Sequence, residues 1–178
     1  MSARSYPELV EALRASGAVR FGQFTLASGQ TSDVYVDIKK AWTEPHRLRR
    51  MAEALAARVG SVDRLAGMEL GAVPLVVATA LETGHPYVVI RKAAKEHGTR
   101  QRYEGEIPPG ARVLVIEDVS TSGGSSAQTV DVVRAAGGVV ERVLVVVDRG
   151  QGARERLAAM GVTLEALVTI DELRGPSS

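Results

Sequence analysis

Five short apolar segments alternate with mostly helical stretches over the last two-thirds of the chain, and this alternation limits the fold more than any other feature. The segments cover residues 64–67, 87–91, 113–117, 143–148 and 164–170. Strands separated by helices pair in parallel through right-handed crossovers, which places helices on both faces of the sheet. The sequence therefore predicts an α/β fold with a central, mostly parallel sheet, and 178 residues suffice for one such domain.

The residues before this region follow a different pattern. Leu9, Val10 and Leu13 have helical spacing, and Gly17 is placed to end that helix. Residues 21–26 and 34–38 have the composition of two short strands around a turn, which is typical of a β-hairpin. The sequence Thr43-Glu44-Pro45 then indicates the start of a second helix. We expect a helix, a hairpin and another helix ahead of the sheet.

The composition excludes several classes of protein. Apolar residues make up 45% of the chain and charged residues 24%, as in ordinary globular domains. The formal net charge is +1, so no global basic field indicates nucleic acid as a partner. Cysteine is absent, which excludes disulfides and thiolate metal sites. No apolar run approaches the ~20 residues that span a bilayer, and the first residues lack an apolar signal core, so we expect a cytoplasmic protein without membrane contact.

One apolar segment leads into a motif with recognisable chemistry. Residues 113–116 are followed by two carboxylates, Glu117 and Asp118, and then by small residues from Thr121 to Ser125. Ligands of parallel sheets bind beyond the carboxyl ends of the strands, and a helix that opens on small residues offers N–H groups to an anion. The two acids would repel a phosphate, so we assign them to ribose hydroxyls. The motif predicts a phosphorylated-sugar site; the alternative is a polar strand end followed by a helix cap.

The connection between Arg91 and Ala111 is long and strongly basic. It shows no helical or strand periodicity in its second half, and loops of this length are usually functional or disordered. Within twelve positions it carries five permanent cations and one histidine, which are Arg91, Lys92, Lys95, His97, Arg100 and Arg102. Such a loop suits the oxygens of a departing pyrophosphate, while the alternative is a solvated charged loop.

Two further residues are candidates for recognition of a base. Tyr35 of the hairpin can stack on a flat heterocycle, or it can simply pack in the core. Arg149 follows Asp148 at the end of an apolar segment, at the same expected edge as Glu117. Its planar guanidinium matches a carboxylate or an imide edge, although a surface arginine in a turn before Gly150 is an equal alternative.

Together these segments resemble the orotate phosphoribosyltransferases, a family of type I phosphoribosyltransferases. The resemblance runs in order from Phe21 to Arg149. It rests on Phe24-Thr25-Leu26-Ala27-Ser28-Gly29 with Ser32, Tyr35 and Asp37, on Arg91-Lys92-Ala93-Ala94-Lys95-Glu96-His97-Gly98, on residues 117–125 and on Asp148-Arg149. The turn at 117–125 alone indicates the superfamily, whereas the hairpin and the basic loop are more specific.

The resemblance implies an organisation and a reaction. Residues 1–178 would form a single domain, in which residues 1–40 and part of the C-terminus make a small hood containing a helix and a β-hairpin, and residues 92–110 make a mobile catalytic loop. The activity would be transfer of the 5-phosphoribosyl group from phosphoribosyl pyrophosphate (PRPP) to orotate, giving orotidine 5′-monophosphate and pyrophosphate in UMP biosynthesis. Mg²⁺ would be the cofactor, held mainly by substrate oxygens. The chain would be a homodimer, with loop 92–110 reaching the neighbouring site.

The resemblance also implies roles for individual residues. Glu117 and Asp118 would hold the ribose hydroxyls, and Thr121 to Ser125 the 5′-phosphate. Thr121 and Arg149 would contact orotate, and Tyr35 would cover its ring. Lys95, His97 and Asp118 would form the catalytic group. The full set expected to bind PRPP is Arg91, Lys92, Lys95, His97, Glu117, Asp118, Val119, Ser120, Thr121, Ser122, Gly123, Gly124 and Ser125.

The chain departs from the family pattern at three positions. Many relatives have lysine where Ala27 and Gly71 stand here, and aspartate in place of Glu117. Without the two lysines, contacts to the pyrophosphate would depend more on the loop cations and on backbone N–H groups of residues 69–72. Glu69 is expected to act as a helix cap.

Two other functions share part of this pattern. A phosphoribosyltransferase for a purine base would have the same turn at 117–125, but the hairpin and the basic loop argue against it. A regulator that binds PRPP and controls nucleic acid would use the same fold, but such proteins usually need an added domain or a basic face, and the sequence shows neither.

Overall fold

The computed structural model describes residues 6–25, 31–93 and 101–175. Within these residues the main body is a six-stranded sheet of order β5-β4-β3-β6-β7-β8. Its strands are β3 (Arg64–Met68), β4 (Tyr87–Ile90), β5 (Tyr103–Glu104), β6 (Val113–Ser120), β7 (Arg142–Asp148) and β8 (Thr163–Thr169). Strand β5 pairs antiparallel with β4, and the other neighbours pair in parallel. The expected α/β fold with a mostly parallel sheet is confirmed.

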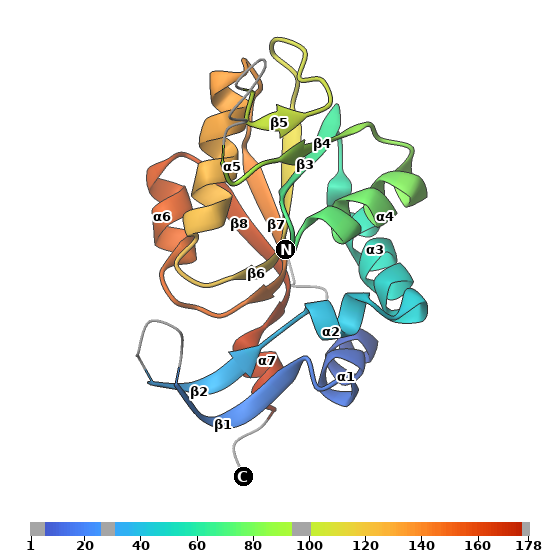
Figure 1. Ribbon diagram of the computed structural model, residues 1–178, viewed down its shortest axis with the longest axis vertical. Helices are drawn as coiled ribbons and strands as arrows, with labels where there is room; N and C mark the ends of the chain where they lie inside the picture. The colour runs from blue at the N-terminus through green and yellow to red at the C-terminus, as the bar shows by residue number, and fades with distance from the viewer. Residues whose placement is uncertain (1–5, 26–30, 94–100, 176–178) are drawn as a thin grey trace.

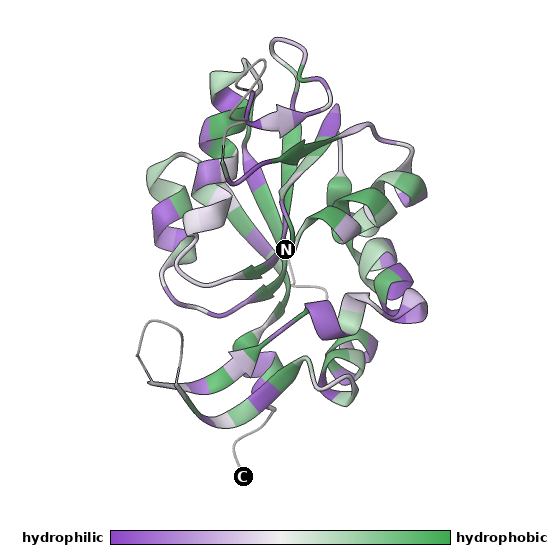
Figure 2. Cartoon of the chain, in the orientation of Figure 1, coloured by the Kyte–Doolittle hydropathy of each residue, from purple (hydrophilic) through white to green (hydrophobic). Residues whose placement is uncertain are grey.

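Helices cover both faces of this sheet (Figure 1). One face carries α3 (Pro45–Val59) and α4 (Val73–Thr83), and the other carries α5 (Gly124–Ala135) and α6 (Ala153–Ala159). Successive residues of a strand point to opposite faces, so Leu114 and Ile116 of β6 belong to one apolar cluster and Val113 and Val115 to the other. Figure 2 shows the resulting concentration of hydrophobic residues in the sheet. Burial on both faces explains why the strands are continuous apolar runs.

A second, smaller group of elements lies beside the main body (Figure 1). It consists of α1 (Pro7–Ala15), the antiparallel hairpin β1 (Val19–Thr25) and β2 (Thr31–Val36), α2 (Lys39–Trp42) and α7 (Ile170–Arg174). Helix α7 is tied to α1 because Arg14 Nε donates to Leu173 O at 2.9 Å. We call this group the hood. The expected N-terminal helix, the hairpin and the helix beginning at Pro45 are all present.

Several details differ from the sequence-based expectations. The basic connection contains strand β5, whose two residues pair with Val89 and Ile90 of β4. Ile107 is buried and Tyr103 packs against the same apolar cluster, so these two side chains anchor the second half of the connection to the sheet. Strand β6 continues through the acid pair to Ser120, and the last strand ends at Thr169, where Thr169 and Glu172 form a capping box that starts α7. None of the helices in the described part of the chain is long and apolar enough to cross a membrane.

Candidate active site

The candidate site lies at the carboxyl edge of the parallel strands. Ser120 of β6 is in register with Asp148 of β7, and Arg149 N donates to Ser120 O at 2.9 Å. The loop after β3 and the Arg91–Lys92 segment after β4 leave the sheet at the same edge. Because parallel strands present all their carboxyl ends together, the topology brings the acid pair, the small-residue turn, the first two loop cations and Arg149 to one place.

The acid pair is partly withdrawn from water. Glu117 is 5% exposed, and its Oε2 accepts a hydrogen bond from Ser125 Oγ at 2.8 Å. Burial, and then repulsion from Asp118, raise the pKa of Glu117 to about 8. Asp118 Oδ1 accepts from Val119 N at 2.8 Å. Glu117 is therefore largely protonated near neutral pH.

The small-residue turn leads directly into a helix N-terminus. Gly123 has φ +73° at the N-cap of α5, and a Cβ there would lie 3.1 Å from Ala153 Cα. Both the backbone conformation and the close approach of α6 therefore require glycine. The first N–H groups of α5 have no partner within the helix, and they open toward the turn formed by residues 121–125. This geometry suits a phosphate group.

A cavity of about 620 Å³ joins the turn to the hood hairpin. Its lining consists of Thr31, Ser32, Asp33, Thr121, Ser122, Arg149 and Gln151. Arg149 Nη2 donates to Ser32 Oγ at 3.1 Å and to Val34 O at 3.4 Å, so this arginine links the main sheet to β2. Burial lowers the pKa of Arg149. Neither of the other two guanidinium nitrogens forms a hydrogen bond with the described residues, and Nε is buried.

Tyr35 does not line this cavity. Its ring centroid lies 5.7 Å from that of Phe24, and the Arg20 guanidinium carbon lies 5.1 Å above the ring. The ring thus packs within the hairpin, which is the alternative that the sequence left open.

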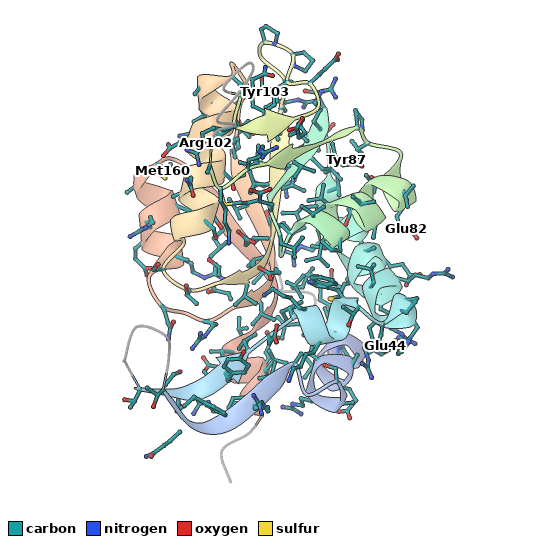
Figure 3. The ribbon with its side chains drawn as sticks, in the orientation of Figure 1. Glu44, Glu82, Tyr87, Arg102, Tyr103 and Met160 are labelled. Carbon is teal, nitrogen blue, oxygen red and sulfur yellow. The ribbon has the colours of Figure 1, made fainter. Side chains whose placement is uncertain are left out.

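The start of the basic connection is held by side chains from two elements. Arg91 Nη1 lies 3.1 Å from Glu104 Oε1, and Arg102 Nη2 donates to Lys92 O at 2.8 Å and to Arg91 O at 3.3 Å. Arg102 and its neighbour Tyr103 stand at the β5 edge of the sheet (Figure 3). The Arg102 side chain is therefore hydrogen-bonded to the backbone and does not extend freely into solvent as a cation for a ligand. Lys95, His97 and Arg100 lie outside the described residues.

Two expectations for the loop after β3 are wrong. Glu69 does not cap α4, since no side chain caps that helix; instead Glu69 Oε1 accepts from Lys92 N at 2.9 Å. The N–H groups of residues 69–72 are not all available, because Glu69 N donates to Ile90 O and Ala72 N to Met68 O. Within the described structure the N–H groups of Leu70 and Gly71 donate no backbone hydrogen bond, so two of the four expected donors are without a backbone partner.

Sequence reasoning missed several residues of the site. Asp33 and Gln151 line the cavity, and Arg102 and Glu104 fix the loop start. Because the hairpin motif already contained Ser32, its neighbour Asp33 could have been predicted from the same motif. Glu104 gave no signal, because its contact with Arg91 depends on the register of a two-residue strand. Among the described residues, no group of three or more His, Asp or Glu side chains is arranged to hold a metal ion.

Comparison with known proteins agrees with this geometry. A family model described as the phosphoribosyl transferase domain matches residues 41–171, and this match defines the class: the chain is a type I phosphoribosyltransferase. The orotate phosphoribosyltransferase of Natronomonas pharaonis is 51% identical over 166 residues, covering 93% of this chain and 95% of that protein. At that identity over nearly its whole length, the chain belongs to the orotate phosphoribosyltransferase family.

Solved structures give the same assignment. The orotate phosphoribosyltransferase from Aeropyrum pernix superposes with a TM-score of 0.82 at 35% identity, covering 93% of this chain and 95% of that one. The Mycobacterium tuberculosis H37Rv enzyme in complex with PRPP superposes with a TM-score of 0.78 at 32% identity, covering 94% and 97%.

Proposed function

We propose that this protein transfers the 5-phosphoribosyl group of PRPP to orotate, giving orotidine 5′-monophosphate and pyrophosphate, a step of pyrimidine biosynthesis. It is then a glycosyltransferase that moves a pentosyl group. One observation carries the proposal: the phosphate turn and Arg149 line one cavity and are joined through the bond from Arg149 N to Ser120 O. A site for a ribose phosphate and a cation for a carboxylated base are thus adjacent.

The acid pair acts on the sugar. In the reaction the bond from C1 to the pyrophosphate oxygen breaks, its electron pair leaves with pyrophosphate, and a ring nitrogen of orotate forms the new bond to C1. The sugar passes through an oxocarbenium-like state, which negative charge stabilises. We assign Glu117 and Asp118 to the ribose hydroxyls. Support comes from their place near the end of β6, which stops at Ser120, and from the hydrogen bond that Ser125 of α5 donates to Glu117; residues 121–125 would bind the 5′-phosphate.

Arg149 and Thr121 are the proposed contacts to the base. The guanidinium of Arg149 matches the orotate carboxylate, and Thr121 lines the same cavity. Tyr35 is kept as a proposed cover for the ring. The Tyr35 ring contacts Phe24 and Arg20, so this role requires it to leave those contacts.

The leaving group requires positive charge. Arg91 and Lys92 follow β4 at the same edge of the sheet as the acid pair, with β3 between the two strands, and we assign them to the pyrophosphate together with Lys95 and His97 of the loop. The proposed active form is a homodimer in which Lys95 and His97 reach the neighbouring site. A loop that carries cations to the leaving oxygens can also exclude water.

Phosphoribosyltransferases generally use Mg²⁺ with PRPP. The residues of this site fit such an ion, because the acid pair offers hard oxygen atoms beside the proposed ribose position. We propose that oxygens of the pyrophosphate and ribose supply most of its ligands. When bound, the ion would neutralise charge on the leaving group.

The proposal is tested by the loss of orotate absorbance, which should require both PRPP and Mg²⁺. Arg149→Ala should raise the orotate KM at least ~10-fold while the PRPP KM stays within about twofold, since one charged contact to the carboxylate is lost. Folded protein that consumes no orotate would overturn the proposed function. An unchanged orotate saturation curve in the variant would overturn the assignment of Arg149.

A further inference from the structure

We propose that Asp33 and Arg174 form a charge-balanced wall of the base site, in which Arg174 neutralises Asp33 so that the cavity keeps the net positive charge that a carboxylated base requires. The inference rests on the proposed function in one respect, that the base is orotate. Arg174 acts through Asp33 and is a positioning residue, whereas Asp33 borders the ligand and affects specificity.

The first step is the placement of an acid beside the recognition arginine. Asp33 and Arg149 line the same cavity. The positive charge of Arg149 contributes to a lowered pKa of Asp33, although the hydrogen bond from Arg174 is the larger cause. Asp33 is therefore ionised at neutral pH. An unneutralised carboxylate here would compete for the Arg149 guanidinium and repel an incoming orotate.

The second step is the neutralising partner. Arg174 Nη2 lies 2.6 Å from Asp33 Oδ2, and the Arg174 guanidinium carbon is 5.4 Å from the Phe21 ring centroid. The cation is thus bound by an acid and an aromatic face of the same hairpin. Counting Asp33, Arg149 and Arg174, the local formal charge is +1, and without Arg174 it is zero.

The third step is the rigidity of the element that presents Arg174. Helix α7 begins with the Thr169–Glu172 capping box, and Leu173 is fully buried. Arg14 of α1 donates to the carbonyls of Glu172 and Leu173 at 3.0 and 2.9 Å. The C-terminal helix is thus fixed on the hood, which explains how a residue 141 positions from Asp33 completes its charge balance.

The magnitude is limited by solvent. The side chain of Asp33 is 66% exposed and that of Arg174 45% exposed, so water and salt screen the pair. We therefore expect a change in orotate affinity of about three- to tenfold rather than its loss.

The experiment compares Arg174→Gln, Asp33→Asn and the double variant with the parent protein at low ionic strength. The orotate KM is measured at saturating PRPP, and the PRPP KM at saturating orotate. Arg50→Gln is the matched control, because Arg50 forms a similarly exposed ion pair with Glu8 in α1, outside the cavity lining.

We expect Arg174→Gln to raise the orotate KM about three- to tenfold with the PRPP KM unchanged, and the double variant to return to within about twofold of the parent. Added salt should shrink the difference. A double variant as impaired as Arg174→Gln would show that Arg174 acts on the hood structure and not through Asp33. An unchanged orotate KM in Arg174→Gln, or an equal rise in Arg50→Gln, would also overturn the proposal. A parent protein that consumes no orotate would instead refute the proposed function, and this inference with it.

Discussion

At the scale of single residues, Glu117 connects the chemistry of the site to the stability of the protein. Its pKa is raised to about 8, first by burial and then by the charge of Asp118. An unfolded chain loses this proton near the ordinary glutamate value, while the folded chain keeps it until about pH 8. Over that interval the native state binds more protons than the unfolded state. Stability is therefore highest below the unfolded pKa and falls as the pH rises toward 8.

Glu117→Gln should remove this dependence, because the amide keeps the acceptor for Ser125 Oγ but cannot ionise. Between pH 5 and 8.5 the parent should lose on the order of 4 kcal/mol of unfolding free energy relative to the variant. Urea denaturation at several pH values measures the difference. Asp118→Asn should reduce it in part, because burial is the larger cause of the shift. Parallel pH profiles for parent and Glu117→Gln would contradict the pKa assignment.

Gly71 is the second residue whose substitution should have a specific effect, because it lies against Asp118. A Cβ at this position would lie 2.7 Å from Asp118 Cγ, so any side chain here requires the Asp118 carboxylate to move. Gly71 therefore permits the position that the Asp118 side chain has in this structure.

Gly71→Ala should lower kcat/KM by about tenfold or more, because the displaced carboxylate no longer faces the sugar in the productive geometry. The melting temperature should change little, since the loop is at the surface. Leu70→Ala is the control, because Leu70 is 61% exposed on the same loop. Full activity in Gly71→Ala would mean that Asp118 is not held in the catalytic position.

At the scale of elements, strand β5 fixes the start of the basic loop. Its antiparallel pairing with β4 places Arg102 beside the carbonyls of Arg91 and Lys92, and Glu104 beside the Arg91 guanidinium. A third contact, from Lys92 N to Glu69, joins the loop to the segment after β3. The first two cations of the loop are therefore positioned before any substrate arrives.

Arg102→Gln should free the first residues of the basic loop, because a shorter glutamine amide cannot donate to the carbonyls of both Arg91 and Lys92 in the same way. We expect the PRPP KM to rise about three- to tenfold while the orotate KM stays within twofold, since only the pyrophosphate side is disturbed. Initial rates with each substrate varied in turn make the distinction. Arg112→Gln serves as a control, because Arg112 pairs with Asp63 where β3 and β6 begin. Equal rises in both constants would indicate a general loss of structure.

The sequence could predict those strands that are long enough to have a recognisable apolar pattern of their own. The apolar runs match β3, β4, β6, β7 and β8, because burial on both faces demands such runs. Strand β5 is too short for any periodicity, and its contacts depend on register with β4. The same limit applies to the site: the acid pair and Arg149 follow from strand ends, whereas the bonds of Glu69 and Asp33 join segments distant in sequence.

At the scale of the whole molecule, the proposed base site lies between the main sheet and the hood. Arg149 reaches from the end of β7 to β2, and Arg174 reaches from α7 to the same hairpin. The proposed ribose and phosphate side, in contrast, is built from β6 and α5 of the main body. Under this proposal, different elements select the base and bind the sugar phosphate.

In the proposed dimer, each site receives the residues that contact the leaving group from both chains. If Lys95 acts in the neighbouring site, Lys95→Ala and Asp118→Asn damage different sites of a mixed dimer. Each variant alone should be almost inactive, but a heterodimer of the two contains one site with both residues intact. Random exchange of subunits should then restore about one quarter of the parent activity, because about half of the dimers are mixed and half of their sites are whole.

The mixture is prepared by unfolding the two variants together and refolding them, with each variant refolded alone as the control. Orotate consumption and the oligomeric state are measured on the same sample. Activity no greater than the mean of the two variants, in a sample shown to be dimeric, would place Lys95 in the site of its own chain. Recovery near one quarter would instead mean that the basic loop, although it starts at the same sheet edge as the acid pair of its own chain, completes the reaction in the neighbouring one.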